Sequence, residues 1–481
     1  MGETPSTAGT HPDPPVDRAD PARGAALWSG RFATPPAPEA HALGVSIGYD
    51  VRLAPQDVEA SVAHVRALEA AGLLTADDAT RLEHALREVG AAIADGSLTP
   101  EPADEDVHSV VERGVTDRLG DLGARLHAGR SRNDLVVTDL RLWLLAARNR
   151  IGGLTTMLIR VLLDRAREHT ETVVPGTTHA RLAQPVTLGH HLLAHAWALL
   201  RDLDRFDGWA RRTAVSPLGA GALATSTLGL DPAATAERLG LARAFGNSLD
   251  AVSDRDFVME FLASAAICGM HLSRIAADLA RWTDESLAWA ELDEAYSTGS
   301  SMMPQKRNPD TAELVRGKAA RIAGDFTALA ALLQGLPLGY HRDLQEDKEP
   351  AFDAADTLEL SLPALVGAIG SVRFHPETMR AACEPAGLYA TDLAEALVAG
   401  GVAFREAHRR TGELLRRLAE EGRTLRDLSV EGWKAFGVPE GAAMLDPDRS
   451  VRARTTPGGP SPDQVRAQIA EIERELAQRR S

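Results

Sequence analysis

Hydrophobic residues recur at spacings of three and four along most of the chain, which is the period of an α-helix with one apolar face. The longest such stripe begins after Asp256 and covers about seven helical turns. It consists of Phe257, Phe261, Ala265, Cys268, Leu272, Ile275, Leu279 and Trp282. A helix of this length is typical of a strut in a helix bundle.

Two further segments repeat the helical pattern. One extends from residue 134 to about residue 168 and opens with Leu140, Leu144 and Ile151. The other carries an apolar stripe made of Val315, Ile322, Phe326, Leu329 and Leu333. Strand-like alternation followed by hairpin turns is nearly absent, so the sequence predicts a mainly α fold with a long central helix bundle.

Segments rich in Pro, Gly and Thr interrupt the helices at 174–184, 216–232 and 296–309, and they hold most of the unusual polar residues. Shorter helices are predicted after Phe374, with a Pro/Gly/Arg-rich stretch at 447–462. These changes predict four parts: a disordered tail (1–24), an N-terminal domain (25–131), a central bundle domain (132–373) and a C-terminal domain (374–481).

Composition excludes several classes of protein. The chain has 481 residues, 44% of them hydrophobic, and can bury a large core. Its formal net charge of -16 argues against a nucleic-acid or anionic-membrane surface, so an anionic ligand needs a local cationic pocket. Cys268 and Cys383 lie in apolar, helix-like settings and imply neither a disulfide framework nor a thiolate metal site.

The N-terminal residues lack both the basic start and the apolar run of a secretion signal. The long Ala/Leu segments are broken by Arg and Asp before they reach the roughly 18 apolar residues of a membrane span. We therefore expect a soluble, cytoplasmic protein.

The segment 297–309 concentrates chemistry suited to an anion. Glycine and adjacent serines predict a mobile loop, while Lys306, Arg307 and Asn308 supply a cation and amide donors for a carboxylate. An ordinary surface loop leading into a helix from Thr311 would have the same composition.

Segment 126–134 similarly places Arg130, Arg132 and Asn133 before a helix N-terminus, which attracts negative charge.

Two other segments carry candidate polar groups. In 175–185, His179 stands beside Thr178 ahead of a helix, which gives a group that titrates near neutral pH next to a hydroxyl. A lone loop histidine also serves structural roles. Segment 340–349 surrounds Leu344 with polar side chains, and a solvated acidic helix start explains it equally well.

Two motifs resemble binding sites but are interpreted as structural. His191 and His195 are four residues apart on a predicted helix, but no third ligand is evident, so a surface or packing role is expected and no metal is predicted. Gly219 and Gly221 resemble part of a dinucleotide loop, yet the preceding strand and the third glycine are missing. No nucleotide cofactor is predicted.

Taken in order, these segments resemble the fumarase/aspartase superfamily. Its motif GSSxMPxKxNP matches residues 299–309. Further segments resemble the argininosuccinate lyase family within it: 27–32, 106–108, 129–134, 247–257 and 345–349. The resemblance implies a three-domain, mostly helical protomer in a homotetramer whose active sites are each built from three chains. It also implies β-elimination of fumarate from an N-substituted succinate, with no cofactor.

The resemblance assigns roles residue by residue. Ser300 is expected to remove the carbon-bound proton as an oxyanion, because a serine hydroxyl itself is far too weak a base. His179 is expected to act as acid or base at the leaving nitrogen, with Glu313 orienting it. Ser301, Lys306 and Asn308 are expected to hold the succinyl carboxylates. Further substrate contacts are expected from Ser46, Asn133, Thr178, Tyr340, Gln345 and Lys348, the last two toward the amino-acid end.

Several positions depart from the family pattern near these residues. Ala128 replaces Thr, Leu135 replaces Gln and His341 replaces Asn. The usual Tyr, Gln and Arg around the histidine are replaced by Thr177, Arg181 and Leu182. Three interpretations stay open: argininosuccinate lyase, a paralogue that releases another amine, guanidine or hydrazine compound, and a non-enzymatic relative. Retention of Ser300, His179, Lys306 and Asn308 weighs against the third.

Overall fold

The computed structural model describes residues 37–479, so the predicted tail (1–24) and the segment 27–32 lie outside the described residues. The chain divides into two compact units, of which the first ends at Ala128 and the second begins at Gly129. The boundary predicted near residue 374 falls inside the second unit and stays a prediction.

The N-terminal unit is helical throughout its described part. Its core is formed by α3, α4 and α5, with fully buried Leu53, Leu68 and Leu82 among the residues between them. A carboxylate fixes the start of α5, because Asp106 accepts a hydrogen bond from the Ser109 N–H at 2.8 Å. The elements are α1 (Pro38–Gly44), α2 (Ile47–Asp50), η2 (Val51–Leu53), α3 (Ala54–Ala70), α4 (Ala76–Ala94), α5 (Val107–Leu119), α6 (Asp121–Ala124) and η3 (Arg125–His127).

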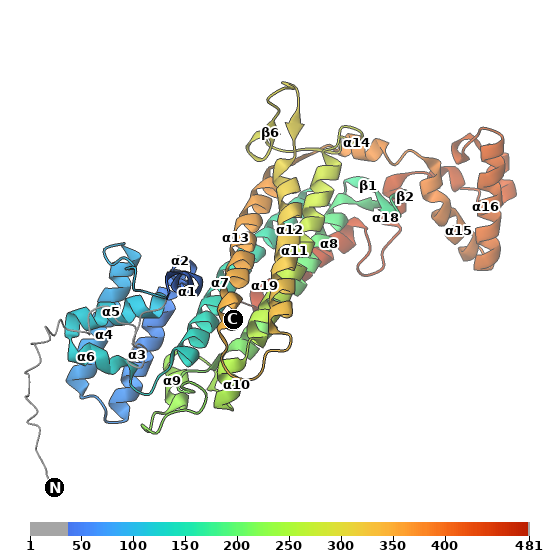
Figure 1. Cartoon of the computed structure of the whole chain (residues 1–481). Coiled ribbons are helices and arrows are strands. Elements are labelled where there is room, and N and C mark those ends of the chain that lie inside the picture. Colours follow the sequence, from blue (N-terminus) through green and yellow to red (C-terminus); the bar gives the residue numbers. More distant parts are fainter. Residues whose placement is uncertain (1–36, 480–481) are drawn as a thin grey trace, which may run out of the picture. The chain divides into compact units, whose positions relative to one another are not determined.

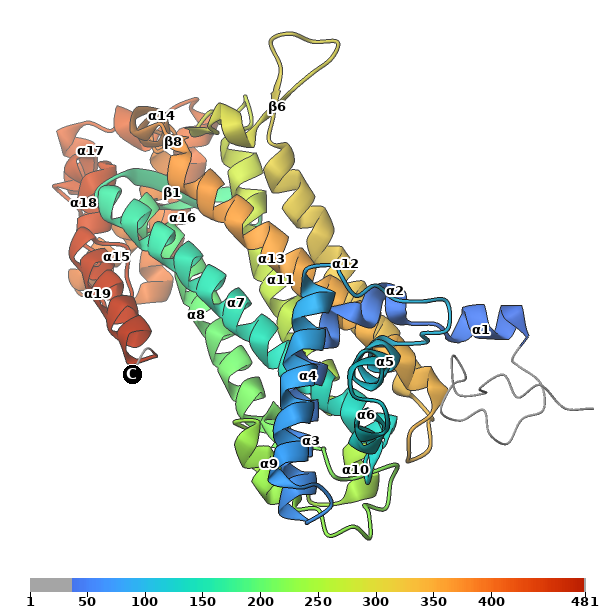
Figure 2. The same ribbon diagram turned by 90° about the vertical axis from the view of Figure 1, so that its left-hand side faces the viewer.

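The second unit is organised by five long helices that lie side by side and alternate in direction (Figures 1 and 2). They are α7 (Arg132–Glu168), α8 (Leu188–Thr213), α11 (Asp256–Trp282), α12 (Asp310–Leu333) and α13 (Lys348–Ser371). Every residue of the stripe predicted after Asp256 is buried in α11. The mainly α bundle is thus confirmed.

By length and composition α11 is apolar enough to cross a membrane, but 56% of its most apolar window is buried inside the protein, as in the core helix of a bundle.

The start of α7 is fixed by a capping box. The Ser131 hydroxyl accepts from the Asn133 N–H at 3.2 Å, and Asp134 accepts from the Ser131 N–H at 3.0 Å. The second oxygen of Asp134 accepts from the N–H groups of Gly219 (3.0 Å) and Gly221 (2.8 Å). These glycines have φ of 103° and 62°, which allows the chain to fold a tight loop over Asp134.

Short strands join the ends of the bundle helices. The longest pair, β1 (Val173–Thr178) and β2 (Arg181–Thr187), is an antiparallel hairpin that the sequence pattern did not predict. Its turn residues, His179 and Ala180, have φ of 51° and 58°, although glycine or asparagine usually marks such a turn. The remaining described ladders are two residues long: β3 (Val215–Ser216) with β4 (Arg243–Ala244), β5 (Ala290–Glu291) with β8 (Arg373–Phe374), and β6 (Thr298–Gly299) with β7 (Arg307–Asn308).

Shorter helices follow Phe374, as predicted. Many of them enclose a separate apolar cluster that includes the buried Tyr389, Leu393 and Trp433, while α19 returns to pack on α7 and α8. The elements are α14 (Pro376–Ala381), η6 (Ala386–Tyr389), α15 (Ala390–Ala399), α16 (Phe404–Glu420), η7 (Leu425–Asp427), α17 (Val430–Phe436), η8 (Gly441–Met444), α18 (Pro447–Arg452) and α19 (Pro462–Gln478). The connections within the bundle add α9 (Pro232–Arg238), α10 (Ser248–Ser253), η4 (Glu294–Tyr296) and η5 (Arg342–Asp347).

Candidate active site

The Gly-Ser-Ser segment forms an exposed loop held at its base by the β6–β7 ladder, which projects beyond the end of the bundle (Figure 1). The Arg307 guanidinium pairs with Glu291 at 2.9 Å and with Glu294 at 2.7 Å. Arg307 therefore anchors the loop, whereas Lys306 is exposed and Asn308 lies within the ladder. The following helix begins at Asp310, one residue before the predicted start.

Ser300 receives two hydrogen bonds from the backbone of its own loop. Its Oγ accepts from the N–H of Met302 at 3.3 Å and from the N–H of Met303 at 3.1 Å. Donors aimed at a hydroxyl oxygen stabilise its deprotonated form more than its neutral form. Ser300 is half-buried and Ser301 is exposed, so both can be reached from solvent.

His179 stands at the tip of the β1–β2 hairpin. It is exposed, as are Thr178 and Arg181, which pair across the turn. A left-handed backbone at two successive residues other than glycine costs free energy, of the order of 1 to 3 kcal/mol each, and persists only where the surrounding structure imposes it. The ladder from Val173 to Thr187 supplies that constraint and keeps His179 exposed at the hairpin tip.

Asn133 lies in the first turn of α7, at the other end of the bundle. Its side-chain Nδ2 donates to the Ala222 carbonyl at 3.1 Å, which ties it to the loop folded over Asp134. The helix N-terminus predicted for this segment is therefore present, with Ser131 as its cap.

Segment 340–349 is divided between solvent and interior, so a solvated acidic helix start explains only part of it. Its exposed residues are Arg342, Asp343, Glu346 and Glu349. Gln345, Asp347 and Lys348 are buried, and the Lys348 ammonium lies 3.1 Å from Asp347. Asp347 also pairs with the buried guanidinium of Arg255. Burying these charges requires that they be paired, which the network provides.

Ser46 belongs to the N-terminal unit and is buried there. Its hydroxyl donates to Asp50 at 2.6 Å, while the other Asp50 oxygen accepts from the Val107 N–H at 3.0 Å. Ser46 is therefore fixed by contacts inside its own unit.

The candidate residues of the second unit fall into two groups at opposite ends of the bundle. Helix α12 separates them, and its 24 residues span about 36 Å. Among the described residues, no hydrogen bond or ion pair links Glu313 to His179, and Glu313 pairs instead with Arg316 at 3.4 Å. The hairpin group comprises Thr178, His179, Ser300, Ser301, Lys306, Asn308 and Glu313, and the opposite group comprises Asn133, Tyr340, Gln345 and Lys348.

One prediction about polar clusters needs correction. His191 and His195 do have a third group nearby, because the Asp278 carboxylate of α11 lies within hydrogen-bond distance of both. More than 80 residues separate Asp278 from the histidines along the chain. The available signal in the sequence was an acidic residue beside Leu279, within the long apolar stripe of α11.

Comparison with known proteins agrees with the motif order. Residues 30–324 match the family model described as lyase, and residues 387–452 match that of the argininosuccinate lyase C-terminal region. The argininosuccinate lyase of Frankia casuarinae is 49% identical over 93% of this chain and 97% of its own length. That of Acidothermus cellulolyticus is also 49% identical, over 94% of both chains. The chain belongs to the argininosuccinate lyase family.

A solved relative supports the same fold. The crystal structure of an EDDS lyase in complex with formate superimposes with a TM-score of 0.80 at 28% identity, covering 93% of this chain and 91% of that one. The argininosuccinate lyase family thus accounts for the bundle. The family also makes the chain a carbon–nitrogen lyase, so the non-enzymatic reading is set aside.

The departures from the family pattern lie in different environments. Leu135 is fully buried in α7, where an apolar side chain suits the core. Arg181 and Leu182 are exposed on β2, immediately after the His179 turn, and His341 is half-buried before η5. Arg181 is thus the added charge that lies nearest in sequence to a proposed catalytic group.

Proposed function

We propose that the protein cleaves argininosuccinate into fumarate and arginine, and so serves arginine biosynthesis in the cytoplasm. The observation that carries the proposal is the 49% identity to curated argininosuccinate lyases over nearly the whole chain. The alternative, a paralogue that acts on another N-substituted succinate, is not favoured at this level of identity.

The proposed reaction is a β-elimination. Ser300, as its alkoxide, takes the proton from the carbon next to a carboxylate, and the electron pair forms the double bond of fumarate as the C–N bond breaks. The N–H groups of Met302 and Met303 support this role, because they stabilise negative charge on Oγ before the proton is taken. His179 supplies the proton that the departing guanidino nitrogen needs.

The succinyl carboxylates require cations and hydrogen-bond donors in the loop that carries Ser300. Lys306, Ser301 and Asn308 lie within eight residues of Ser300, and the exposed ammonium of Lys306 provides positive charge in the same loop. Charge that develops on a carboxylate during proton removal is stabilised most by donors already in position. In this proposal Glu313 orients His179.

The active site is completed, we infer, by other copies of the chain in a homotetramer. Two end groups about 36 Å apart cannot meet around one small substrate within a single protomer. Large apolar side chains are also exposed on the bundle helices, which favours further packing. They are Met157, Met270, Leu314 and Leu360.

Substrate identity is tested by following the ultraviolet absorbance of fumarate with argininosuccinate and a panel of N-substituted succinates. We expect the highest kcat/KM with argininosuccinate. The quadruple variant T177Y/R181Q/L182R/H341N restores the family residues, and its kcat/KM for argininosuccinate should stay within about tenfold of the wild type if the departures are neutral. A larger gain, or faster turnover of another succinate, would favour the paralogue.

A further inference from the structure

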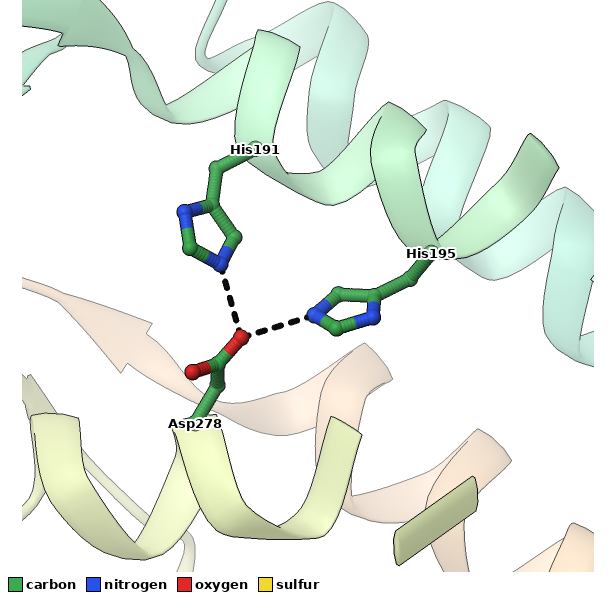
Figure 3. Close-up of side chains that lie close together, drawn as sticks. All are labelled: His191, His195 and Asp278. Atoms are coloured by element: carbon green, nitrogen blue, oxygen red, sulfur yellow. Dashed lines mark hydrogen bonds and ion pairs between the residues drawn. The ribbon is translucent and has the colours of Figure 1, made fainter. Parts of the chain in front are cut away.

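Three side chains outside the candidate active site converge between two bundle helices. His191 and His195 lie one turn apart on α8, and Asp278 faces them from α11 (Figure 3). The Nε2 atoms of His191 and His195 lie 2.7 Å and 2.8 Å from the same carboxylate oxygen, Oδ2. The three donor atoms thus surround one small volume, with each pair within 4.8 Å.

The separations suit a tetrahedral metal ion after a small adjustment. Ligand atoms at about 2.0 to 2.2 Å from Zn²⁺ in a tetrahedral array lie roughly 3.3 to 3.6 Å from one another. Each histidine–carboxylate contact would therefore have to open by about 0.5 to 0.9 Å, which side-chain rotation provides. Two imidazoles and one carboxylate are a ligand set that divalent zinc, cobalt and nickel accept.

The orientation of the two rings also suits a cation. Each Nε2 atom, and not Nδ1, is the ring nitrogen that faces Oδ2 of Asp278. In the tautomer that carries its proton on Nδ1, each ring directs an Nε2 lone pair toward the space between the three groups.

The surroundings leave room for a further ligand while fixing the rings. Trp282 packs edge-on against His191 with ring centroids 5.0 Å apart, and Phe374 packs on Trp282 at 5.8 Å. The side chains of His191 and Asp278 are 35% and 29% exposed, against 14% for His195. Water can therefore occupy the fourth position of the metal.

We propose that His191, His195 and Asp278 bind one divalent transition-metal ion, of the zinc class, that links α8 to α11. Among the described residues, no hydrogen bond or ion pair joins these three side chains to the proposed catalytic side chains, so the role we assign to the metal is to stabilise the bundle. Hard cations such as Mg²⁺ prefer all-oxygen ligands and do not fit two imidazoles. The competing explanation is a carboxylate shared by two histidines with no metal affinity.

The test is titration of chelator-treated full-length protein with Zn²⁺ by calorimetry. The wild type should bind one Zn²⁺ per chain, and D278N and H195Q should each bind at least about tenfold more weakly, since even indirect ligand partners contribute 10- to 100-fold in metal affinity. A matched control is H84A, which removes an exposed histidine on α4 that lies 3.5 Å from a single carboxylate, Glu88. Its Zn²⁺ affinity should equal that of the wild type.

Two further measurements keep the outcome decisive. Zn²⁺ should raise the Tm of the wild type and of H84A but not of D278N, and Co²⁺ should give the visible absorption of a tetrahedral complex in the wild type only. Mg²⁺ should do neither. Substoichiometric binding, or equal affinity in wild type and in both cluster variants, would show that the three residues form hydrogen bonds alone. Circular dichroism of D278N and H195Q establishes that lost binding is not lost folding.

Discussion

Arg255 and Asp347 form an ion pair in which each side chain is only 1% exposed. The pair joins the segment that precedes α11 to the segment that precedes α13, and Lys348 adds a second cation 3.1 Å from Asp347. Two sequence motifs that are some ninety residues apart are thus parts of one buried network. Because Gln345 and Lys348 are proposed substrate contacts, the network positions them.

Removing one member of this pair should destabilise the protein strongly. Arg255→Met leaves the Asp347 carboxylate buried with fewer partners, and loss of one partner of a buried pair costs about 3 to 5 kcal/mol. Urea denaturation should show a lowered midpoint for this variant. Arg212→Met, which breaks the exposed pair with Glu260, is the control and should shift stability by about 1 kcal/mol or less.

Replacing the proposed base should remove activity without affecting the fold. Ser300→Ala eliminates an oxygen on an exposed loop, and we expect kcat for argininosuccinate to fall by about 100-fold or more. The far-UV spectrum, the Tm and the oligomeric state should match the wild type. Ser286→Ala, on another exposed turn, should retain full activity, and a kcat near wild type for Ser300→Ala would refute the assignment.

Mixed oligomers should regain activity lost in each parent. Ser300→Ala damages the hairpin group and Asn133→Ala damages the opposite group, so a site built from different chains can combine two intact halves. Co-expression of the two variants should yield fumarate-forming activity well above that of either alone. The pair Ser300→Ala with Lys306→Ala, from the same group, should show no such recovery. Mixed oligomers without recovery would place a complete site within one chain.

Stability should depend on pH through Asp325 on α12. Burial and the neighbouring Asp353 carboxylate raise the pKa of Asp325 to about 7, from 3.8. The ionised form is therefore disfavoured in the folded state, and stability rises as the pH falls from about 8 toward 5 and Asp325 takes up a proton. Asp325→Asn should raise Tm at pH 8 and have little effect at pH 5.

The control for this prediction is Asp117→Asn, which neutralises an exposed carboxylate on α5. It should give similar small shifts at both pH values. Equal effects of Asp325→Asn at pH 5 and pH 8, measured at one protein concentration, would contradict the raised pKa.

Periodicity was sufficient to predict the bundle, because α11 buries one continuous stripe from Phe257 to Trp282. The stripe predicted in α12 is buried only in part, since Phe326 and Leu333 are half-buried. The β1–β2 hairpin was missed, since His179 and Ala180 adopt a left-handed turn that local preference disfavours and tertiary structure imposes. Burial of Asp347 and Lys348 was missed for a related reason. Their partner Arg255 is distant in sequence, and local polarity alone resembles a solvated helix start.

The same limit applies to Asp278. Its neighbours His191 and His195 come from a different helix, and a contact between helices leaves no periodic mark on either sequence. The loop 297–309 was predictable by contrast as a loop, because its conformation depends on residues that follow one another directly and on a short ladder that closes on itself.

The length of α12 sets the distance between the hairpin group and the opposite group of candidate residues. Each residue advances a helix by about 1.5 Å and rotates it by about 100°. Deleting one residue from the 24 of α12 would therefore turn Tyr340 and everything after it out of register with the Ser300 loop. If the active site combines the hairpin group of one copy with the opposite group of another, the distance between the two groups must be kept. Side chains along the helices and the lengths of the loops can then vary in evolution, whereas the number of residues in α12 cannot.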